Sequence, residues 1–409
     1  MIYIFLLIVS LIVLAQYRLE RNIVNLISIL IVPYIFNIVV NNFFVSRLLG
    51  FYSISDDVLQ MLILAFLAFF LGSLPPSIVL RRNYIIELDN IKRFSHYYID
   101  KMVMLVGAIA IIGLIKLAYI YLTGGFNSAN FIDNEGVMGN GILGHLLLLS
   151  YSIIPIIFLY WTYNPKKISY LIVVVLIMLI TFSTFVKNNI IALAVNIAIF
   201  LLIYRKSVFM KSIIFLCLFT ILVFVANYAI GFYTRGITVN PMFYINHLWI
   251  YLAGSIIYDN YIFIDGIRTG INIFDKLMIF LSALPNMFFN KFWGFRIFEH
   301  ISQTSRPIGD YGQCSNVVDA FGYLYPSGGN LTDVFVFSIV IVIIGFLFSY
   351  VYSYSKLNVR YFSTFSSIFL TYFVFFSFFG TFYINPGPWE CLVYALVIPR
   401  LFVRRPRKL

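Results

Sequence analysis

Residues 61–72 read MLILAFLAFFLG, twelve consecutive positions without a charged side chain. A transmembrane β-strand alternates apolar and polar residues over about 10 positions, and this stretch does not alternate. An α-helix needs about 20 mostly apolar residues to cross the hydrocarbon core of a bilayer, and the apolar run around this stretch covers 57–80. The stretch therefore predicts a membrane-spanning helix and argues against a barrel.

The same composition continues along the whole chain. Of the 409 residues, 62% are hydrophobic and 11% are charged, whereas a soluble domain has about 25% charged residues. We therefore expect an all-α, polytopic membrane protein of about 11 spans, with 10 to 12 compatible with the pattern. The predicted spans are 2–16, 23–41, 57–80, 102–122, 143–162, 168–186, 189–204, 212–231, 333–353, 361–380 and 389–403. The first lacks a basic leader and a cleavage site, which favours a span over a cleaved signal.

The charges of the connecting segments separate by side. The connections that follow the odd-numbered spans, together with the C-terminal tail, hold 19 Lys and Arg against 4 Asp and Glu. The connections that follow the even-numbered spans hold 8 against 12. Basic residues collect on the cytoplasmic side of membrane proteins. The pattern predicts an N-terminus outside and a C-terminus in the cytoplasm. It also accounts for the net charge of +12 without a nucleic-acid partner.

Three regions follow from this topology. Residues 1–231 hold eight spans with short loops, 232–332 form one large outer loop, and 333–409 hold three spans and a basic tail. Within the loop, LMIFLSALPNMFF (277–289) is apolar but too short to span, which predicts an interfacial or re-entrant segment. Pro241 suits the first turn of a helix. Three cysteines without metal-ligand spacing predict no metal site, and we expect no cofactor.

The stretch RPIGDYGQCSNVVDAFGYLYPSGG (306–329) differs from its apolar surroundings by its charges and glycines. We expect it on the outer side of the membrane that the chain spans, beside the membrane surface and just before the span that begins near Asp333. Glycines suit tight turns and the close approach of a ligand. Two interpretations stay open: a solvated connector, or a substrate-binding loop.

Within this stretch, SNVVDAFGYLYPSGGN (315–330) resembles the asparagine, acidic, Phe-Gly and Gly segment that precedes a late span in the bacterial O-antigen polymerases (Wzy, oligosaccharide repeat-unit polymerases). TFSTFVKNNIIALAVNIAIFLLIYRK (181–206) is similar to the mid-chain hairpin of that family, which carries a basic residue at its outer tip. Here the tip holds Lys187, where arginine is usual. Lysine keeps the charge but lacks the bidentate fork of arginine.

The resemblance implies a glycosyltransferase that joins undecaprenyl-pyrophosphate-linked repeat units at the periplasmic face of the bacterial inner membrane, for lipopolysaccharide biosynthesis. Its partners would be lipid-linked oligosaccharide and membrane lipids, and a chain-length regulator protein stays open as a further partner. A flippase and an O-antigen ligase are the alternatives. A flippase should have short loops and ionisable residues buried within its spans, whereas here Lys116 is the one charged residue deep in a predicted span and the outer loop 232–332 is large.

Such a reaction needs cations for the diphosphate, a base for the hydroxyl proton, and contacts for sugars. The candidates for the pyrophosphate are Arg235, Arg306, Lys187 and Arg296. The candidate bases are Asp319, which holds the acidic position of the family-like segment, and His300. The candidates for sugar binding are His247, Tyr251 and Asp310. Each also has a structural alternative, as an ion pair, an interfacial anchor or a packed side chain.

Overall fold

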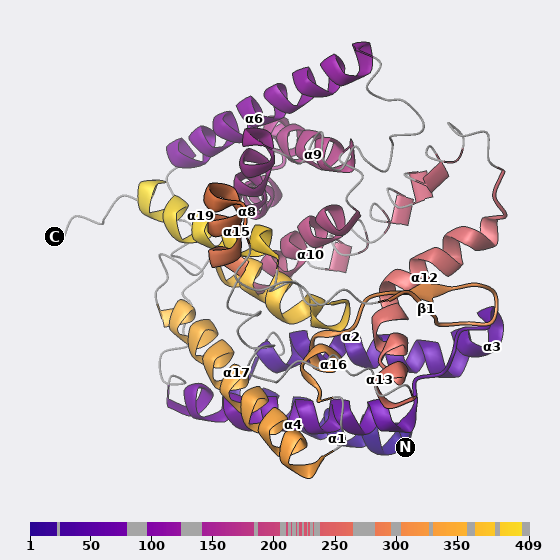
Figure 1. Ribbon diagram of the computed structural model, residues 1–409. Coiled ribbons are helices and arrows are strands. Elements are labelled where there is room, and N and C mark those ends of the chain that lie inside the picture. Colours follow the sequence, from indigo (N-terminus) through magenta and orange to yellow (C-terminus); the bar gives the residue numbers. More distant parts are fainter. Residues whose placement is uncertain are drawn as a thin grey trace. The chain divides into compact units, whose positions relative to one another are not determined.

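The computed structural model describes residues 1–22, 25–79, 96–123, 141–183, 187–204, 238–264, 283–295, 304–326, 330–357, 365–380 and 385–402, with single residues and pairs between 210 and 232. These parts are helical apart from one short hairpin (Figure 1). Within them, six helices are long and apolar enough to cross a membrane, and three apolar helices are shorter. The chain is therefore a helical membrane protein, while the predicted number of 11 spans is not confirmed.

The chain divides into two compact units. Unit 1 comprises Met1–Tyr84, Ile245–Leu357 and Tyr372–Trp389, and unit 2 comprises Ile85–Tyr244, Asn358–Thr371 and Glu390–Leu409. The elements of unit 1 are α1 (Ile2–Glu20), α2 (Leu26–Val40), η1 (Asn41–Val45), α3 (Ser46–Leu49), α4 (Asp56–Val79), most of α12 (Pro241–Tyr258), α13 (Asn260–Ile264), α15 (Ala283–Trp293), β1 (Arg306–Pro307), β2 (Cys314–Ser315), α16 (Ala320–Leu324), α17 (Leu331–Leu357) and η5 (Phe375–Phe378). Those of unit 2 are α6 (His96–Leu122), α8 (Ile142–Tyr163), α9 (Ile168–Ser183), α10 (Lys187–Tyr204) and most of α19 (Pro386–Phe402), while η4 (Leu370–Val374) crosses the boundary.

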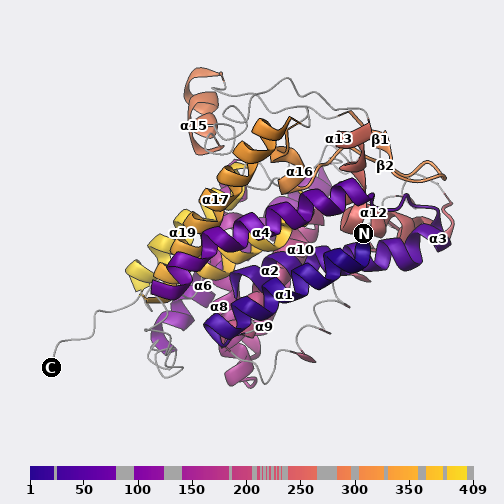
Figure 2. The ribbon, with the colours of Figure 1, turned by 90° about the horizontal axis from the view of Figure 1, so that it is seen from below.

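In unit 1, α4 runs alongside α17 at very short range (Figures 1 and 2). A Cβ atom added to Gly72 would lie 2.0 Å from the carbonyl oxygen of Val342, and one added to Gly345 would lie 2.3 Å from that of Phe69. The two backbones are thus in contact, which only glycine allows at these positions. Small residues give this kind of close approach between membrane helices, where dispersion and hydrogen bonds replace the hydrophobic effect.

A short series of polar contacts adds α1 to this pair. The Gln16 amide donates to Ser77 Oγ at 3.0 Å, and Ser77 Oγ lies 3.3 Å from Ser349 Oγ. The Ser349 hydroxyl donates in turn to the Ser73 carbonyl oxygen at 3.0 Å. Because all four residues are buried, these hydrogen bonds satisfy groups that would otherwise be costly in an apolar setting.

The span that begins with α2 contains a π-helical turn. Helices α2 and α3 are joined through η1, so that Leu26–Leu49 form one apolar helix. At the turn, the Asn41 amide donates to the Tyr52 carbonyl oxygen at 3.0 Å and accepts from Trp249 Nε1 at 2.9 Å. The turn thus aims a buried amide at α12 and fixes that helix against α2. Such turns are frequent at functional sites.

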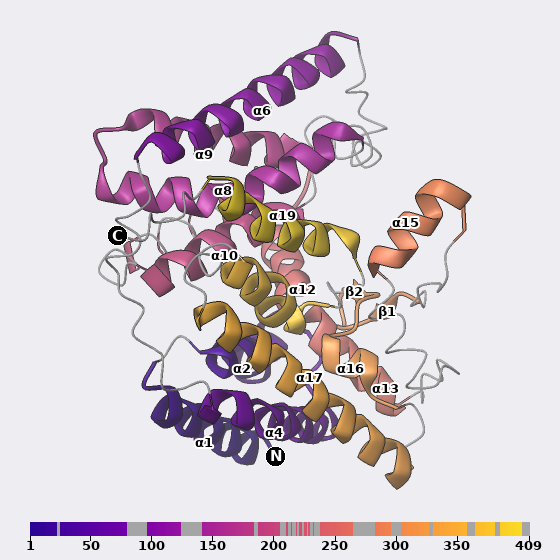
Figure 3. The same ribbon diagram turned by 90° about the vertical axis from the view of Figure 1, so that its left-hand side faces the viewer.

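Unit 2 is a bundle in which α6, α8 and α9 contact one another and α10 contacts α8 and α9 (Figure 3). At one end, Lys167 Nζ lies 2.9 Å from Asp100 Oδ1, and the Tyr170 hydroxyl donates to the same oxygen at 2.6 Å. The charge pattern places Asp100 and Lys167 on the same side of the membrane, and this contact agrees with that pairing.

The apolar segment 277–289 is described only from Ala283 onward, where it forms the start of α15. The rings of Phe288, Phe292 and Trp293 on this helix are 50%, 63% and 60% exposed. Exposed aromatic rings are typical of helices at a membrane interface. The interfacial position expected for this segment therefore stays a prediction.

Candidate functional site

The stretch 306–329 begins with a tight hairpin in unit 1. Strands β1 and β2 pair antiparallel, and Ile308 N–H donates to the Gln313 carbonyl oxygen at 2.7 Å. The chain reverses through Gly312, whose φ of 76° lies in the left-handed region that glycine adopts without strain. The hairpin is therefore a defined structure and not an irregular connector.

Backbone contacts hold this hairpin against the segment between α3 and α4. Tyr52 N–H donates to the Ile308 carbonyl oxygen and Asp310 N–H donates to the Gly50 carbonyl oxygen, both at 2.9 Å. A Cβ atom on Gly309 would lie 2.8 Å from the Gly50 oxygen, so the close approach requires glycine. The Asp310 side chain itself is exposed, which leaves its predicted contact with sugar untested.

Arg306 lies at the edge of the hairpin, half-buried. Its guanidinium carbon is 5.7 Å from the centre of the Tyr261 ring, a distance at which a cation is attracted to the face of the ring. The Tyr261 hydroxyl donates to the Pro307 carbonyl oxygen at 2.6 Å, and the Tyr258 hydroxyl donates to that of Thr304 at 2.9 Å. Two tyrosines from α12 and α13 thus fix β1 and the cation that it carries.

The predicted sugar contacts His247 and Tyr251 occupy neighbouring turns of α12. Both are half-buried, and their rings meet edge to face at 5.4 Å. Phe379 covers one face of the Tyr251 ring, nearly parallel at 5.8 Å. Trp249, between them in sequence, is buried with its Nε1–H bonded to Asn41. Trp249 is therefore a packed ring, and the contacts of His247 and Tyr251 with sugar stay predictions.

Asp319 follows the hairpin and is fully buried. Its Oδ1 accepts from Gly322 N–H at 2.5 Å, which caps the short helix α16. On that helix, the Phe321 ring lies 5.8 Å from Tyr34 and 5.5 Å from Phe66. Tyr34 and Phe66 lie near the middle of the candidate spans Leu26–Leu49 and Asp56–Val79.

The contacts of α16 bear on the expectation that the stretch 306–329 lies beside the membrane surface. Phe321 packs against residues of two candidate spans of its own unit, so α16 lies among these helices, and its depth in a membrane stays a prediction. Polar backbone among apolar helices must be satisfied by protein, and the Asp319 carboxylate does this for α16.

A second buried carboxylate, Asp259 between α12 and α13, lies against this cap. A Cβ atom on Gly322 would lie 2.5 Å from Asp259 Oδ1, so the carboxylate touches the α16 backbone. Neither Asp259 oxygen, nor Asp319 Oδ2, nor the Tyr34 hydroxyl has a hydrogen bond of ordinary geometry within the described chain. The two carboxyl groups are nevertheless close enough to influence each other's ionisation.

The two carboxyl groups resist ionisation. Burial raises the pKa of Asp259 well above its ordinary value, and the negative charge of Asp319 raises it further. Burial raises the pKa of Asp319 to about 6, an effect that the Gly322 N–H and the Tyr34 hydroxyl oppose. Two like charges in an apolar site cannot both persist without a counter-charge, so at least one proton stays on the pair near neutral pH.

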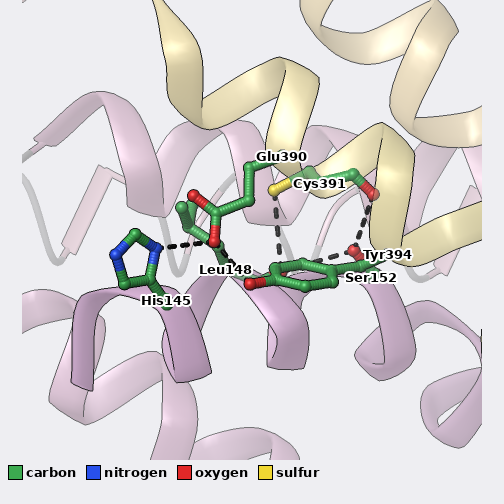
Figure 4. A network of polar contacts seen from close by, with 6 residues as sticks. All are labelled: His145, Leu148, Ser152, Glu390, Cys391 and Tyr394. Atoms are coloured by element: carbon green, nitrogen blue, oxygen red, sulfur yellow. Dashed lines mark hydrogen bonds and ion pairs between the residues drawn. The ribbon is translucent and has the colours of Figure 1, made fainter. Parts of the chain in front are cut away.

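The structure brings together a further polar group in unit 2, from residues that the sequence did not single out (Figure 4). His145, at the start of α8, has its Nδ1 atom 2.7 Å from Glu390 Oε1 on α19. The Tyr394 hydroxyl donates to the same oxygen at 2.5 Å. The His145 side chain is 46% exposed and that of Glu390 is 13% exposed, so an open imidazole is joined to a mostly covered carboxylate.

Several predicted residues lie outside the part of the chain that is described. They are Arg235, Arg296 and His300, together with the side chain of Lys187, whose backbone begins α10. The roles predicted for them stay predictions. No group of three His, Cys, Asp or Glu side chains suited to a metal ion occurs among the described residues.

Comparisons with protein-family models, with curated proteins and with solved structures find no match to this chain.

Proposed function

We propose that this chain is a membrane glycosyltransferase that polymerises undecaprenyl-pyrophosphate-linked oligosaccharide repeat units at the periplasmic face of the bacterial inner membrane. In this reaction a sugar hydroxyl of one repeat unit attacks the anomeric carbon of the glycan on another. The bond from that carbon to the pyrophosphate oxygen breaks, and the lipid pyrophosphate leaves with the electron pair. The protein has to neutralise the diphosphate, position both glycans and accept the hydroxyl proton.

The observation that carries the proposal is the position of Arg306. It is a half-buried cation on a hairpin that Tyr258, Tyr261 and the α3–α4 segment fix. The charge pattern predicts that this hairpin lies on the side away from the cytoplasm. Arginine suits a diphosphate because its planar fork donates two parallel hydrogen bonds to phosphate oxygens. Arg235, Lys187 and Arg296 are the further cations that we propose for the same group.

Asp319 has a different part in this proposal. Because Asp319 is buried and caps α16, we assign it a positioning role: it holds α16 in place next to the hairpin. His247, Tyr251 and Asp310 remain the proposed sugar contacts, and His300 stays a proposed base.

The proposal is tested in a deletion strain complemented with variants, by gel electrophoresis of surface lipopolysaccharide. We expect the deletion to leave core capped with a single repeat unit. Arg306→Ala should restore no long chains and Arg306→Lys only short ones, because lysine lacks the fork. Arg47→Ala is the matched control, since Arg47 is an exposed arginine of α3 in the same unit, and it should restore the wild-type ladder.

Two results would contradict this reading. Core without any O-antigen in the deletion strain would indicate a flippase or a ligase instead of a polymerase. A wild-type ladder from Arg306→Ala, with normal protein levels, would show that Arg306 is not part of the site. The polymerase function would then be judged from the deletion strain alone.

A proton-coupled flippase is the second candidate, and the Asp259–Asp319 pair favours it. Ionisable groups buried at membrane depth often form proton relays in transporters, and no Lys or Arg pairs with either carboxylate among the residues described. The gel separates the two functions, because a lost flippase leaves the core bare. Polymerase remains the first proposal, since the large loop carries the fixed cation.

A further inference from the structure

Residues 258–261, with the sequence YDNY, form the junction between α12 and α13 in unit 1. The Tyr258 hydroxyl donates to the Thr304 carbonyl oxygen at 2.9 Å, and the Tyr261 hydroxyl donates to that of Pro307 at 2.6 Å. Figures 2 and 3 show α13, α16 and the two strands of the hairpin near one another. The first and last residues of the junction therefore hold the start of the hairpin.

The two middle residues of the junction hold other segments of the same unit. Asn260 accepts from the Ser55 N–H and donates to the Ser53 carbonyl oxygen, both at 2.9 Å, so it fixes the connection between α3 and α4. Asp259 lies against α16, because a Cβ atom on Gly322 would lie 2.5 Å from its Oδ1 atom. One stretch of four residues thus joins the hairpin, the α3–α4 connection and α16.

The contact between the junction and α16 sets two acids against each other. Asp319 caps α16 through the Gly322 N–H at 2.5 Å, so its carboxyl group and that of Asp259 meet at the same residue. Both side chains are fully buried, and no Lys or Arg of the described chain forms an ion pair with either. Two like charges cannot both persist in such a place without a counter-charge. The contact is therefore stable only while the pair keeps a proton.

The neighbouring elements supply no other group that changes charge near neutral pH. Among the described residues, the titratable group that faces the pair from another element is the Tyr34 hydroxyl of α2, and a tyrosine keeps its proton between pH 5 and 8. Phe66 of α4 and Phe378 of η5 pack around the Tyr34 ring. Arg306 faces the ring of Tyr261. The proton of the pair is therefore the group whose loss changes the charge at this contact.

We propose that the Asp259–Asp319 pair is a proton-operated latch in unit 1, which keeps the junction against α16 while the pair holds a proton. When both carboxyl groups ionise, their repulsion separates the junction from α16. The hairpin moves with the junction, because Tyr258 and Tyr261 bond to its backbone. The latch is closed at low pH and open at high pH, and it controls how firmly Arg306 is held, whichever reaction the hairpin serves.

The test is hydrogen–deuterium exchange of the full-length protein in detergent, measured by mass spectrometry for wild type and Asp259→Asn. The two proteins are compared at the same pH, so that the intrinsic pH dependence of exchange cancels. Each unit of pH changes the equilibrium of an opening that releases one proton by about tenfold. We therefore expect peptides from 304–326 to exchange about tenfold or more faster in wild type than in the variant at pH 8. At pH 5, where the pair is protonated, the rates should agree.

Two further variants test the path from the pair to the hairpin. Tyr261→Phe removes the bond to the Pro307 carbonyl oxygen, so it should raise the exchange of the hairpin at both pH values and leave the pH dependence of α16 unchanged. Asp310→Asn is the matched control, because this acid is exposed on the hairpin, and it should follow wild type. Peptides from α4 in the same unit should stay protected in every protein, which separates a local opening from unfolding of unit 1.

Three results would overturn the latch. The first is equal exchange of wild type and folded Asp259→Asn at pH 8. The second is a difference confined to the peptides of α16, which would show that the junction does not pass the change to the hairpin. The third is a loss of protection in α4 together with the hairpin, which would show that unit 1 unfolds as a whole. The lipopolysaccharide gel tests the proposed glycosyltransferase function separately from all three.

Discussion

At the scale of single residues, Asp259 and Asp319 decide how unit 1 responds to pH. An acid whose pKa is raised by folding holds its proton more tightly in the folded state than in the unfolded state. Its contribution therefore favours folding at low pH, where both states are protonated, and is lost as pH rises through the folded pKa. For Asp319 this window runs from about 4, the ordinary value, to the folded value of about 6, and Asp259 extends it upward.

We predict that the melting temperature of the wild-type protein in detergent falls as pH rises from 5 to 8, and that Asp259→Asn weakens this fall. The amide has almost the same shape as the carboxyl group and carries no charge, so it removes both the desolvation of a carboxylate and its repulsion of Asp319. Differential scanning fluorimetry across this pH range measures the effect, and the variant should melt higher than wild type at pH 8.

The exposed acid Asp310 supplies the control for this prediction. Asp310→Asn changes the same functional group at an exposed position of the β1–β2 hairpin in the same unit, and its melting curve should follow wild type at every pH. An Asp259→Asn protein with the full wild-type pH dependence would show that the pair does not control the stability of unit 1.

Of the two polar groups, the sequence analysis identified one residue of the first, Asp319, and none of the second, which contains His145 and Glu390. Asp319 stands in the family-like segment, but its partner Asp259 and the Tyr34 hydroxyl come from distant positions. His145 and Glu390 are 245 residues apart, and no local pattern joins them. A sequence pattern could have indicated Asp259 and Glu390, because each is a lone acid next to a long apolar run. The two stretches are SIIYDN (255–260) and PGPWECLVY (386–394).

At the scale of elements, the contact between α4 and α17 depends on two glycines. Gly72→Ala should destabilise unit 1, because the added methyl group has no space against the Val342 carbonyl oxygen and the helices must separate. Overpacking of this kind costs about 1–3 kcal/mol. The expected result is a lower melting temperature in detergent and a lower yield of folded protein.

Gly107→Ala is the control for this change. Gly107 also lies inside a long apolar helix, α6, but an added Cβ atom would meet Val173 at 3.7 Å, an ordinary contact distance. Its stability should match wild type or exceed it, since alanine favours helix more than glycine does. Equal effects of the two substitutions would show that the close contact is not what glycine provides at position 72.

The elements were predictable where they are long and apolar. The stretch 61–72 lies inside α4, and α12 begins at Pro241 as expected. The hairpin and α16 were not predictable, because they are too short for periodicity to be visible. The position of α16 among the helices comes from Phe321 packing between Tyr34 and Phe66, which is a tertiary contact without a local pattern.

At the scale of the whole molecule, the orientation in the membrane can be tested with cysteines. Cys314 is exposed on the hairpin, and Cys391 is fully buried. In a Cys217→Ala background, a membrane-impermeant maleimide should label intact spheroplasts at Cys314, because the charge pattern predicts that the hairpin lies outside. Mass spectrometry of the labelled peptides identifies the site.

Cys314→Ser should abolish the labelling, which excludes Cys391 as its source. Labelling of Cys314 that appears only after the membrane is disrupted would reverse the predicted orientation. It would place the hairpin and Arg306 in the cytoplasm, where a periplasmic polymerase could not use them.

The glycine contact between α4 and α17 also has a consequence for the order of synthesis. Gly72 and Gly345 lie about 270 residues apart, so at 5 to 20 residues per second a ribosome makes α17 roughly 15 to 55 seconds after α4. During that interval, α4 is already in the lipid with its glycine face uncovered. The nascent chain must therefore keep this face available through the insertion of the intervening helices, and unit 1 can close only when synthesis is nearly complete.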